Sequence, residues 1–464
     1  MGIGALDYKK GGSGLDINGL IEDYYVYAGE KVSAGDFVEF INGVASESIE
    51  TSTLTSIVSS ANVGQRISAC KLSEDKIFIA HNSGTGNNSL HGIVCTINNS
   101  IIIRGADTTI LSGNYTGNCM SVVALSETSV FISYSKGSNY YLCAIVCTID
   151  GTTITAGTSS GLSSQQLSSK YSVSSTVLKN GNVFVAHSYA SSALLRGIVC
   201  SVNGTTITAG TDTVLSSETH SGYFIETCLT QDGNVFVAHS YASSRYLYGI
   251  VCPVEGTTIT AGTDKALVAI DSAGNQISMC LLENGKIFIA HCWGRSICLY
   301  GIICTVTNTT ITRGTSTQLS TLDSVGNVIS VGLLDNGDVF IAHSNSDYYY
   351  LYGMVCSVNN TTITSKTDVA LCETQYTGEQ ITTLMLGTRI FIAHSYSSNR
   401  NLYGQIWNVD KSTDIVTNEI AITTHEIQVR PATSLPCNGV AKSSGEGGDS
   451  TGHKDVVSVY ISDV

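Results

Sequence analysis

The sequence contains few charged residues, since Asp, Glu, Lys and Arg make up only 13% of its 464 residues. Soluble domains carry about 25%. Disordered chains combine many charges with few apolar residues, whereas 42% of this chain is hydrophobic, and disorder is therefore excluded. The net charge of −14 argues against nucleic acid as a partner, because binding phosphates requires clustered Lys and Arg.

Long apolar runs are also missing. No stretch approaches the roughly 18 apolar residues of a membrane-spanning helix. The first residues lack the apolar core of a secretory signal. We therefore expect a chain made in the cytoplasm, without membrane insertion.

The sequence lacks the motifs of several enzyme and metal sites. It has no CxxC pair for zinc, no GxSxG elbow, no HExxH helix, no DxDxDG calcium loop and no SxDxGxTW box. Glycosidases need two carboxylates flanking a cleft, and no pattern pairs Glu226 with Asp271 or Asp347. The sequence thus predicts a protein that is not an enzyme and has no cofactor and no metal site.

A repeat of 51 to 53 residues is the strongest signal in the chain. Strings such as KIFIAH and NVFVAH end at His81, Tyr134, His187, His239, His291, His343 and His394. A second string, GIVC or a close variant, follows each of the first six, and Trp407 replaces the cysteine in the seventh. Self-similarity at such a period indicates a repeat architecture.

Each repeat predicts four antiparallel strands, with Asn-Gly or Asp-Gly at the first hairpin turn in most repeats. In the second strand, Ile77 and Ile79 point one way and Phe78 and Ala80 the other, so both faces are apolar. That pattern is expected of a blade packed between two other blades. The sequence therefore predicts an all-β, seven-bladed β-propeller over residues 47–424. The alternative, a solenoid, would need capping repeats, and none is evident.

Two residue types recur once per repeat. The cysteines are predicted to be buried thiols rather than disulfide partners, because equivalent positions in different blades lie too far apart: Cys95, Cys147, Cys200, Cys252, Cys304 and Cys356. The histidines are spread around a circle for the same reason and cannot converge on one ion. We expect each to be buried and bonded to a nearby hydroxyl or carbonyl.

The long loops between the second and third strands carry the candidate binding residues. Tyr, Ser, Asn and Arg dominate these tips, a composition typical of antibody paratopes and suited to sugar rings. The candidates are Tyr140, Tyr141, Tyr241, Arg245, Trp293, Arg295, Asp347, Tyr348, Tyr349, Tyr396 and Arg400. The tyrosines of the LYG strings are instead predicted to pack between blades: Tyr248, Tyr300, Tyr352 and Tyr403.

The two chain ends are predicted to form one small β module. Neither 1–46 nor 425–464 is long enough to bury a core alone, and INGVAS near the start is echoed by CNGVAK near the end. The simplest interpretation is a split β-barrel into which the propeller is inserted. Residues 413–422 are predicted to finish the last blade, alongside 48–58. Candidate docking residues of the barrel are Phe37, Phe40, Val456 and Val459.

The terminal pattern resembles a known family. AGEKVSAGDFVEF, then NGVA, then a Gly-rich stretch and VVSVYI resemble small virion proteins of tailed bacteriophages, most of all the head-decoration type. Insertions of this kind of propeller are similar to those in structural proteins of phages that infect Firmicutes. The resemblance implies a compact terminal barrel and a homo-oligomer, a trimer in relatives.

The function implied by the resemblance is that of a non-enzymatic virion structural protein on the particle surface. The barrel would dock on other virion proteins as a capsid decoration, and the propeller would attach to the host surface, with a cell-surface glycan as partner. The alternatives are a tail fibre or baseplate receptor-binding protein, a cellular lectin-like propeller and a glycan-degrading enzyme.

Overall fold

The computed structural model describes most of residues 54–409 and short strands from both chain ends. In the repeat region the described residues are 54–59, 63, 66–82, 89–98, 101–113, 119–137, 140–167, 173–189, 194–218, 221–241, 246–269, 276–293, 298–322, 325–345, 348–396, 398 and 400–409. The described terminal segments are 21–26, 31–32, 37–42, 416–417, 427–431, 439–441, 445–446 and 456–460. None of this part of the chain forms a helix with the length and apolarity needed to cross a membrane.

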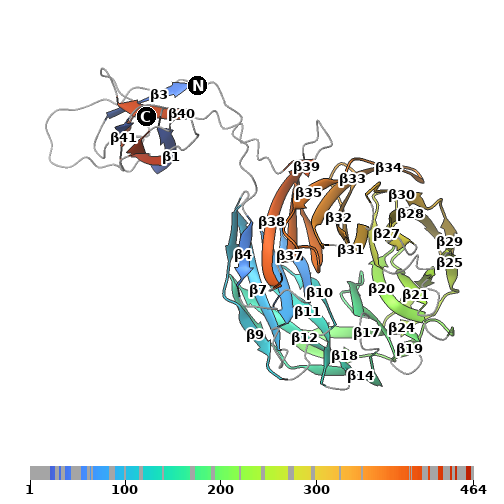
Figure 1. Ribbon diagram of the computed structural model, residues 1–464. Coiled ribbons are helices and arrows are strands. Elements are labelled where there is room, and N and C mark those ends of the chain that lie inside the picture. The colour runs from blue at the N-terminus through green and yellow to red at the C-terminus, as the bar shows by residue number, and fades with distance from the viewer. Residues whose placement is uncertain are drawn as a thin grey trace. The chain divides into compact units, whose positions relative to one another are not determined.

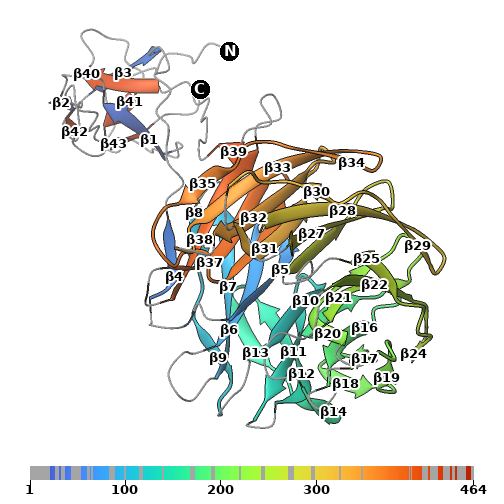
Figure 2. The ribbon, with the colours of Figure 1, turned by 45° about the vertical axis from the view of Figure 1, so that its right-hand side comes forward.

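Seven four-stranded blades form a propeller, as the repeat predicts (Figure 1). The innermost strands, named a, are β5 (Ile67–Ser73), β10 (Met120–Ser126), β15 (Val173–Val177), β20 (Ser221–Leu229), β26 (Ile277–Leu281), β31 (Val325–Leu333) and β36 (Ile381–Leu386). Strands b are β6 (Lys76–Asn82), β11 (Ser129–Lys136), β16 (Val183–Ser188), β21 (Val235–Tyr241), β27 (Ile287–Trp293), β32 (Val339–Asn345) and β37 (Arg389–Tyr396). Consecutive a strands contact each other, and β36 contacts β5, which closes the ring. Figure 2 shows the orange strands of blade 7 beside the blue strands of blade 1.

Strand c of each blade pairs on its outer side with a strand that is broken into two segments. Strands c are β7 (Leu90–Asn98), β12 (Tyr141–Asp150), β17 (Leu195–Asn203), β22 (Leu247–Cys252), β28 (Cys298–Thr307), β33 (Leu351–Asn359) and β38 (Asn401–Val409). The outer segments of blades 1 to 3 are β8 (Ile101–Arg104) with β9 (Thr108–Leu111), β13 (Thr153–Ala156) with β14 (Ser160–Gln166), and β18 (Thr206–Ala209) with β19 (Thr213–Val214).

Blade 4 departs from this pattern. Its strand c is followed by β23 (Val254–Glu255), which pairs with β24 (Thr258–Ile259) as a separate hairpin, and β25 (Lys265–Val268) pairs with β22. The outer segments of the next two blades are β29 (Thr310–Arg313) with β30 (Thr317–Gln318), and β34 (Thr362–Ser365) with β35 (Val369–Cys372).

Blade 7 is completed by strands from both sides of the repeat region. On its outer edge, β38 pairs with β39 (Val416–Thr417) and with β4 (Thr55–Val58), so segments from both predicted closing stretches do finish the last blade. Phe391 and Ala393 of blade 7 pack with Ile77 and Ile79 of blade 1. Apolar burial between blades 7 and 1 therefore stabilises the closed ring, together with the strand pairing that completes blade 7.

The core lies between blades and is built mainly by strands b. Both faces of strand b are buried, as predicted, because each face packs against a different neighbour: Ile77, Phe78, Ile79 and Ala80 are all 0% exposed. Across one interface, Phe236 and Ala238 of blade 4 pack with Ile287 and Ile289 of blade 5.

In several blades a glycine on strand c makes room for the strand-b phenylalanine. A Cβ atom on Gly249 would lie 2.7 Å from Cζ of Phe236, closer than real Cβ contacts allow. The glycine of the GIVC string thus lies where the phenyl ring from strand b crosses strand c. The cysteine of the same string is a buried free thiol in each of the first six blades, as predicted. Burial raises the pKa of Cys200, for example, to about 12, which keeps it a neutral thiol.

Strands from the two ends pair with one another. β1 (Ile21–Val26) pairs with β40 (Ile427–Pro431) and β43 (Val456–Tyr460), and β3 (Phe37–Asn42) pairs with β40 and β41 (Gly439–Ala441). By contacts the chain divides into Met1–Glu50 with Ile420–Val464, and Thr51–Glu419. The side chains of the candidate docking residues lie outside the described residues: Phe37, Phe40, Val456 and Val459. The split barrel and its docking role remain predictions.

Candidate functional site

In several repeats a bulge in the outer strand brings an aspartate toward the histidine of strand b. In blade 3 the segment between β18 and β19 is Gly210-Thr211-Asp212, and the Gly210 N–H donates to the carbonyl of Val199 at 2.8 Å. A Cβ atom on Gly210 would lie 2.8 Å from that same oxygen, so the bulge favours glycine. The break turns Asp212 back over strand c, toward His187 on strand b.

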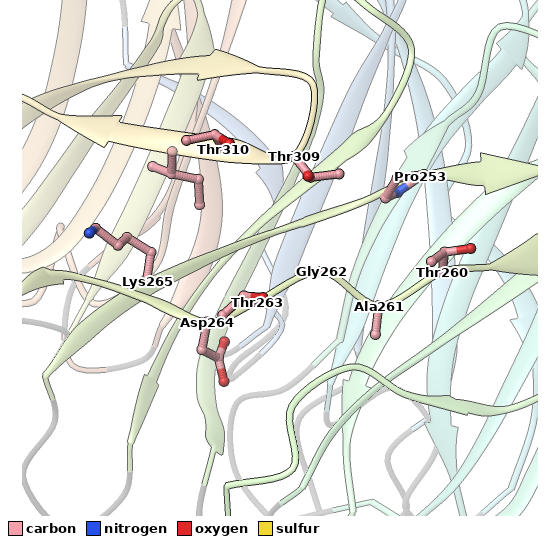
Figure 3. Close-up of a pocket in the computed structure, with 10 residues that line it drawn as sticks. Pro253, Thr260, Ala261, Gly262, Thr263, Asp264, Lys265, Thr309 and Thr310 are labelled. Carbon is pink, nitrogen blue, oxygen red and sulfur yellow. The ribbon is translucent and has the colours of Figure 1, made fainter.

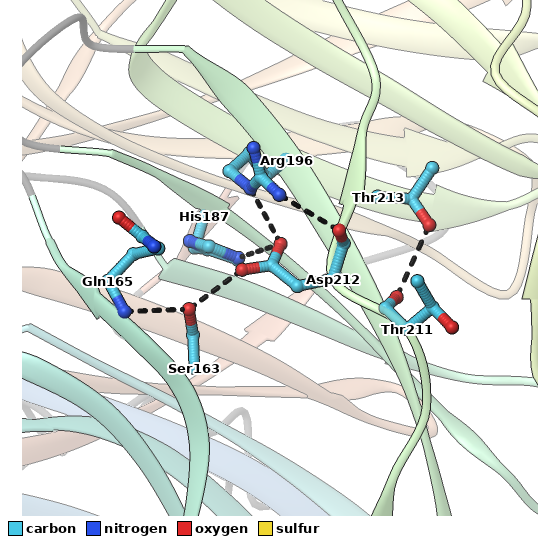
Figure 4. Close-up of polar contacts among 7 residues, drawn as sticks. All are labelled: Ser163, Gln165, His187, Arg196, Thr211, Asp212 and Thr213. Carbon is cyan, nitrogen blue, oxygen red and sulfur yellow. Dashed lines mark hydrogen bonds and ion pairs between the residues drawn. The ribbon is translucent and has the colours of Figure 1, made fainter.

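His187 and Asp212 form the centre of a polar unit (Figure 4). His187 Nε2 donates to Asp212 Oδ1 at 3.2 Å, and Arg196 Nε donates to the same oxygen at 2.8 Å. Ser163, from the preceding blade, donates to Oδ2 at 2.7 Å. The carboxylate is thus held by three side chains from two blades, and the unit ties adjacent blades together as well as shaping the surface.

Three other blades repeat the pair of histidine and aspartate. The Nε2 to Oδ1 distances are 3.1 Å for His81 and Asp107, 2.9 Å for His239 and Asp264, and 2.6 Å for His343 and Asp368. All the histidines of the repeat are buried, as predicted. The prediction of a hydroxyl or carbonyl partner is wrong for Nε2 in these four blades, because it overlooked the aspartate that the bulge delivers 25 or 26 residues later.

The remaining blades show what replaces the aspartate. In blade 5 His291 Nε2 lies 3.1 Å from the hydroxyl of Ser316, and in blade 2 the Tyr134 hydroxyl lies 2.5 Å from Ser159. In blade 7 Leu54 occupies the position, and His394 Nε2 has no partner among the described residues. Burial lowers the pKa of His394 to about 4, although hydrogen bonds to the carbonyls of Ser395 and Thr377 oppose the shift.

The charge state of the aspartates follows from these contacts. Burial opposes ionisation of Asp107, Asp212 and Asp264. Hydrogen bonds and charge from the histidines outweigh that effect and hold the pKa of each carboxyl below its ordinary value. These three residues are therefore carboxylates over the whole range from weakly acidic to alkaline pH.

Acid is expected to weaken the propeller through Asp212. The folded-state pKa lies below the unfolded value of about 3.9, so the stabilisation is complete above about pH 4 and is lost as the pH falls through the folded value. Urea melts of the wild type and Asp212→Asn at about pH 6 and about pH 3 should show a larger difference in unfolding free energy at the higher pH. An equal difference at both would contradict this role.

Ring stacking covers the histidines. Tyr248, Tyr300 and Tyr352 stack on the histidine of their own blade, with ring centroids 5.9, 6.0 and 5.7 Å apart, and are half-buried. Packing of these LYG tyrosines between blades remains a prediction. The position faces the strand-b histidine directly across the ladder, so the tyrosine covers that histidine and remains partly open to solvent.

Part of the predicted binding surface at the b–c tips lies within the described residues. Tyr141 and Tyr348 are exposed at 40% and 50%. Tyr241 stacks on Tyr248 with ring centroids 4.1 Å apart, and the ring centroids of Tyr396 and Tyr403 are 4.4 Å apart. Three tip residues share a left-handed backbone with φ of 50° to 54°: Tyr140, Tyr349 and Arg400.

The other tip residues lie partly outside the described part of the chain. Arg400 forms an ion pair with Glu379, so the charge of its guanidinium group is already compensated. Arg245, Arg295 and Asp347 lie outside the described residues, as does the side chain of Trp293. Binding at the tips therefore remains a prediction.

The innermost strands carry a ring of hydroxyls at one position. Ser68, Ser121, Ser174, Ser278 and Ser330 each accept a hydrogen bond of 2.9 to 3.1 Å from a backbone N–H of the next blade. Glu226 occupies this position in blade 4. Burial raises its pKa to about 7, against hydrogen bonds from Ser174 and the Thr227 backbone. A carboxyl with such a pKa has a property of general acids, which the strand pattern alone did not predict.

A groove opens beside the broken outer strand of blade 4 (Figure 3). Its volume is about 460 Å³, and its lining residues come from blade 4 and from the outer hairpin of blade 5: Pro253, Thr260, Ala261, Gly262, Thr263, Asp264, Lys265, Thr309, Thr310 and Ile311. Lys265 rises toward the side of Thr310, while Asp264 points the opposite way. Asp264 is held by His239 and Ser216, so its carboxylate is already bound.

Pro253 explains why the groove lies in blade 4. The equivalent residues in the other blades are Thr96, Thr148, Ser201, Thr305, Ser357 and Asn408. Proline has no N–H to donate to the ladder, so the pairing between strand c and the outer strand is interrupted. Sequence reasoning missed this groove, although a proline inside a repeated strand is a visible signal of such an interruption.

Comparisons with known proteins identify similar folds but no family. Neither a protein-family model nor a curated protein matches the sequence. A solved polysaccharide lyase, Uly1, is 10% identical, with a TM-score of 0.45, over 83% of this chain and 100% of its own. The NanB sialidase of Streptococcus pneumoniae is 11% identical, with a TM-score of 0.43, over 79% and 71%. A puromycin-hydrolyzing peptidase of Mycobacterium tuberculosis is 11% identical, with a TM-score of 0.45, over 84% and 58%.

The predicted function of a non-enzymatic phage virion protein is contradicted by these comparisons. The similar propellers are mostly enzymes, and nothing in them indicates a phage origin or a head-decoration association. The terminal motifs that suggested a virion protein are short and cover a small part of the chain, which explains the error. At such low identity and TM-score the similar structures assign no activity to this chain.

Proposed function

We propose that this propeller binds an acidic, hydroxyl-rich ligand, a saccharide containing uronic acid, in the groove of blade 4. This ligand would contact neither the b–c tips nor any virion protein. The observation that carries it is the groove of about 460 Å³ with an exposed lysine on its wall. That volume lies within the range of about 300–1,000 Å³ that is usual for small-ligand sites.

The charge of the groove favours an anion. Lys265 is exposed, and its ammonium group has no ion pair among the contacts of the described residues. The nearest acid on the same segment, Asp264, is turned toward His239 and accepts its hydrogen bond at 2.9 Å. A ligand carboxylate would therefore meet a cation that forms no ion pair with the described part of the chain.

The remaining lining favours hydroxyl groups. Four threonines from two blades contribute side-chain hydroxyls, and each can donate or accept a hydrogen bond: Thr260, Thr263, Thr309 and Thr310. A sugar ring presents hydroxyls of the same dual character at several points. The lining also includes Ile311 and the ring of Pro253, which offer apolar surface to the C–H groups of a sugar.

The lysine occurs in one blade only. The residue paired with the strand-c glycine or alanine at this position is Thr108, Ser160, Thr213, Thr317, Val369 or Thr55 in the other six blades. Blade 4 alone combines this cation with the interrupting proline. We therefore expect one ligand per chain rather than one per blade.

Isothermal titration with an oligogalacturonate and with the matching neutral oligogalactose tests the proposal. Lys265→Ala is expected to weaken binding of the acidic ligand about 10- to 100-fold, since a hydrogen bond to a charged group contributes about 1.5–3 kcal/mol. Lys136→Ala is the matched control, because it removes the same charge from an exposed position in blade 2. Its affinity should equal that of the wild type.

Two outcomes would contradict the proposal. The first is an equal loss in both lysine variants, which would indicate a general effect of charge. The second is equal affinity of the wild type for the acidic and the neutral oligosaccharide, which would remove the role of the cation.

A further inference from the structure

Blade 1 differs from the other blades in the residue that covers the strand-b histidine. Directly across the ladder from that position stand Cys143, Arg196, Tyr248, Tyr300, Tyr352 and Tyr403 in blades 2 to 7. In blade 1 the residue is His91, which faces His81. The bulge of blade 1 supplies Asp107, as it supplies an aspartate in three other blades. Two imidazoles and a carboxylate therefore meet in this blade.

The three side chains converge on one point. Asp107 Oδ1 lies 3.1 Å from His81 Nε2 and 3.1 Å from His91 Nδ1, and all three atoms lie within 4.8 Å of one another. The imidazole rings are 5.4 Å apart and inclined by 30°. Ligands about 2.0–2.1 Å from a tetrahedral zinc ion are about 3.3 Å apart, so small side-chain movements would complete a coordination shell.

The second nitrogen of His81 is placed as in known metal sites. Its Nδ1 lies 3.5 Å from the backbone carbonyl oxygen of Asn82. A ligating histidine commonly donates its other N–H to a backbone carbonyl, which leaves the metal-facing nitrogen with its lone pair. In the free protein Nε2 donates to Asp107. On metal binding the proton would move to Nδ1, beside the Asn82 carbonyl, and Nε2 would present its lone pair to the ion.

The site is anchored on one side and open on the other. The side chain of His81 is 0% exposed, whereas those of His91 and Asp107 are 17% and 32% exposed. A metal ion would therefore bind a rigid, buried imidazole and two groups reachable from solvent. Three protein ligands with an accessible fourth position are the pattern of open zinc sites.

We propose that His81 Nε2, His91 Nδ1 and Asp107 Oδ1 bind a divalent first-row transition ion, with zinc as the expected ion and water in the remaining position. The ligand set of two imidazoles and one carboxylate suits zinc and its neighbours rather than calcium or magnesium. The proposal departs from the sequence-based expectation that the protein has no metal site. That expectation considered histidines of different blades, which lie too far apart, and overlooked the additional histidine within blade 1.

Zinc titration of the full chain, without a histidine tag and after chelator treatment, tests the proposal. One zinc ion per chain is expected for the wild type. His91→Tyr is expected to weaken binding at least about tenfold, since it removes one of three ligands. The variant should fold, because tyrosine occupies this position in four other blades.

A gain of binding provides the matched control. Tyr248→His places the same three groups in blade 4, where His239 and Asp264 are already 2.9 Å apart, and should raise the stoichiometry to two. Cobalt spectra should show nitrogen and oxygen ligands. The proposal is overturned if the wild type binds no zinc, if His91→Tyr binds it equally well, or if the cobalt spectrum shows thiolate ligands.

Discussion

Replacing Phe236 by alanine is expected to destabilise the propeller by about 3–5 kcal/mol. The ring is fully buried and packs with Ile287 and Ile289 of the next blade and with Leu267 of its own. It also fills the space beside Gly249, where no side chain can compensate for its loss. The cavity would therefore lie at an interface between blades, and the unfolding free energy from denaturant melts measures the loss.

Truncation of an exposed aromatic residue is the matched control for Phe236→Ala, because it removes a ring that is not buried between blades. Tyr348 is 50% exposed, and Tyr348→Ala should change the unfolding free energy by less than about 0.5 kcal/mol. A loss below about 1 kcal/mol for Phe236→Ala would mean that strand b does not pack between two blades as described.

Trp407→Ala, in the last blade, is expected to lower the free energy of unfolding by a similar amount, about 3–5 kcal/mol. Trp407 is 1% exposed and packs with Val355 of blade 6 and with Ile390 and Ile392. Its Nε1–H donates to Oε1 of the buried Gln405 at 3.0 Å. The substitution would leave both a cavity and an acceptor without its donor, at the blade that closes the ring.

Trp407→Phe distinguishes these two effects. Phenylalanine keeps most of the volume but cannot donate to Gln405, so a loss of about 1–3 kcal/mol is expected, smaller than that of the alanine variant. If phenylalanine were as disruptive as alanine in thermal and urea melts, the hydrogen bond rather than the packing would dominate at this position.

The propeller could be predicted from the sequence because its signals repeat. Strand b is apolar on both faces in every repeat, and only burial between two blades explains Ile77 and Phe78 pointing in opposite directions into apolar surroundings. The glycine of GIVC was visible as a repeated residue, but its reason was not. That reason, the approach of Phe236 to Gly249, involves two strands and appears only when they are paired.

The polar units were harder to predict, because their partners are separated by 25 or 26 residues and joined by a bulge. A strand pattern assigns His187 to a buried position but does not indicate that Gly210 breaks the outer strand and returns Asp212 to it. The proposed sites lie where the repeats differ. Pro253, Lys265 and His91 each depart from the residue that recurs at their position, so the pattern common to the repeats does not predict them.

A crystal structure of the propeller with a bound oligogalacturonate tests the central claim most directly. The proposed function predicts one saccharide in the groove of blade 4, with its carboxylate on the Lys265 ammonium group and its hydroxyls on Thr309 and Thr310. A saccharide bound at the b–c tips instead, or a groove left empty at concentrations that saturate binding in solution, would contradict it.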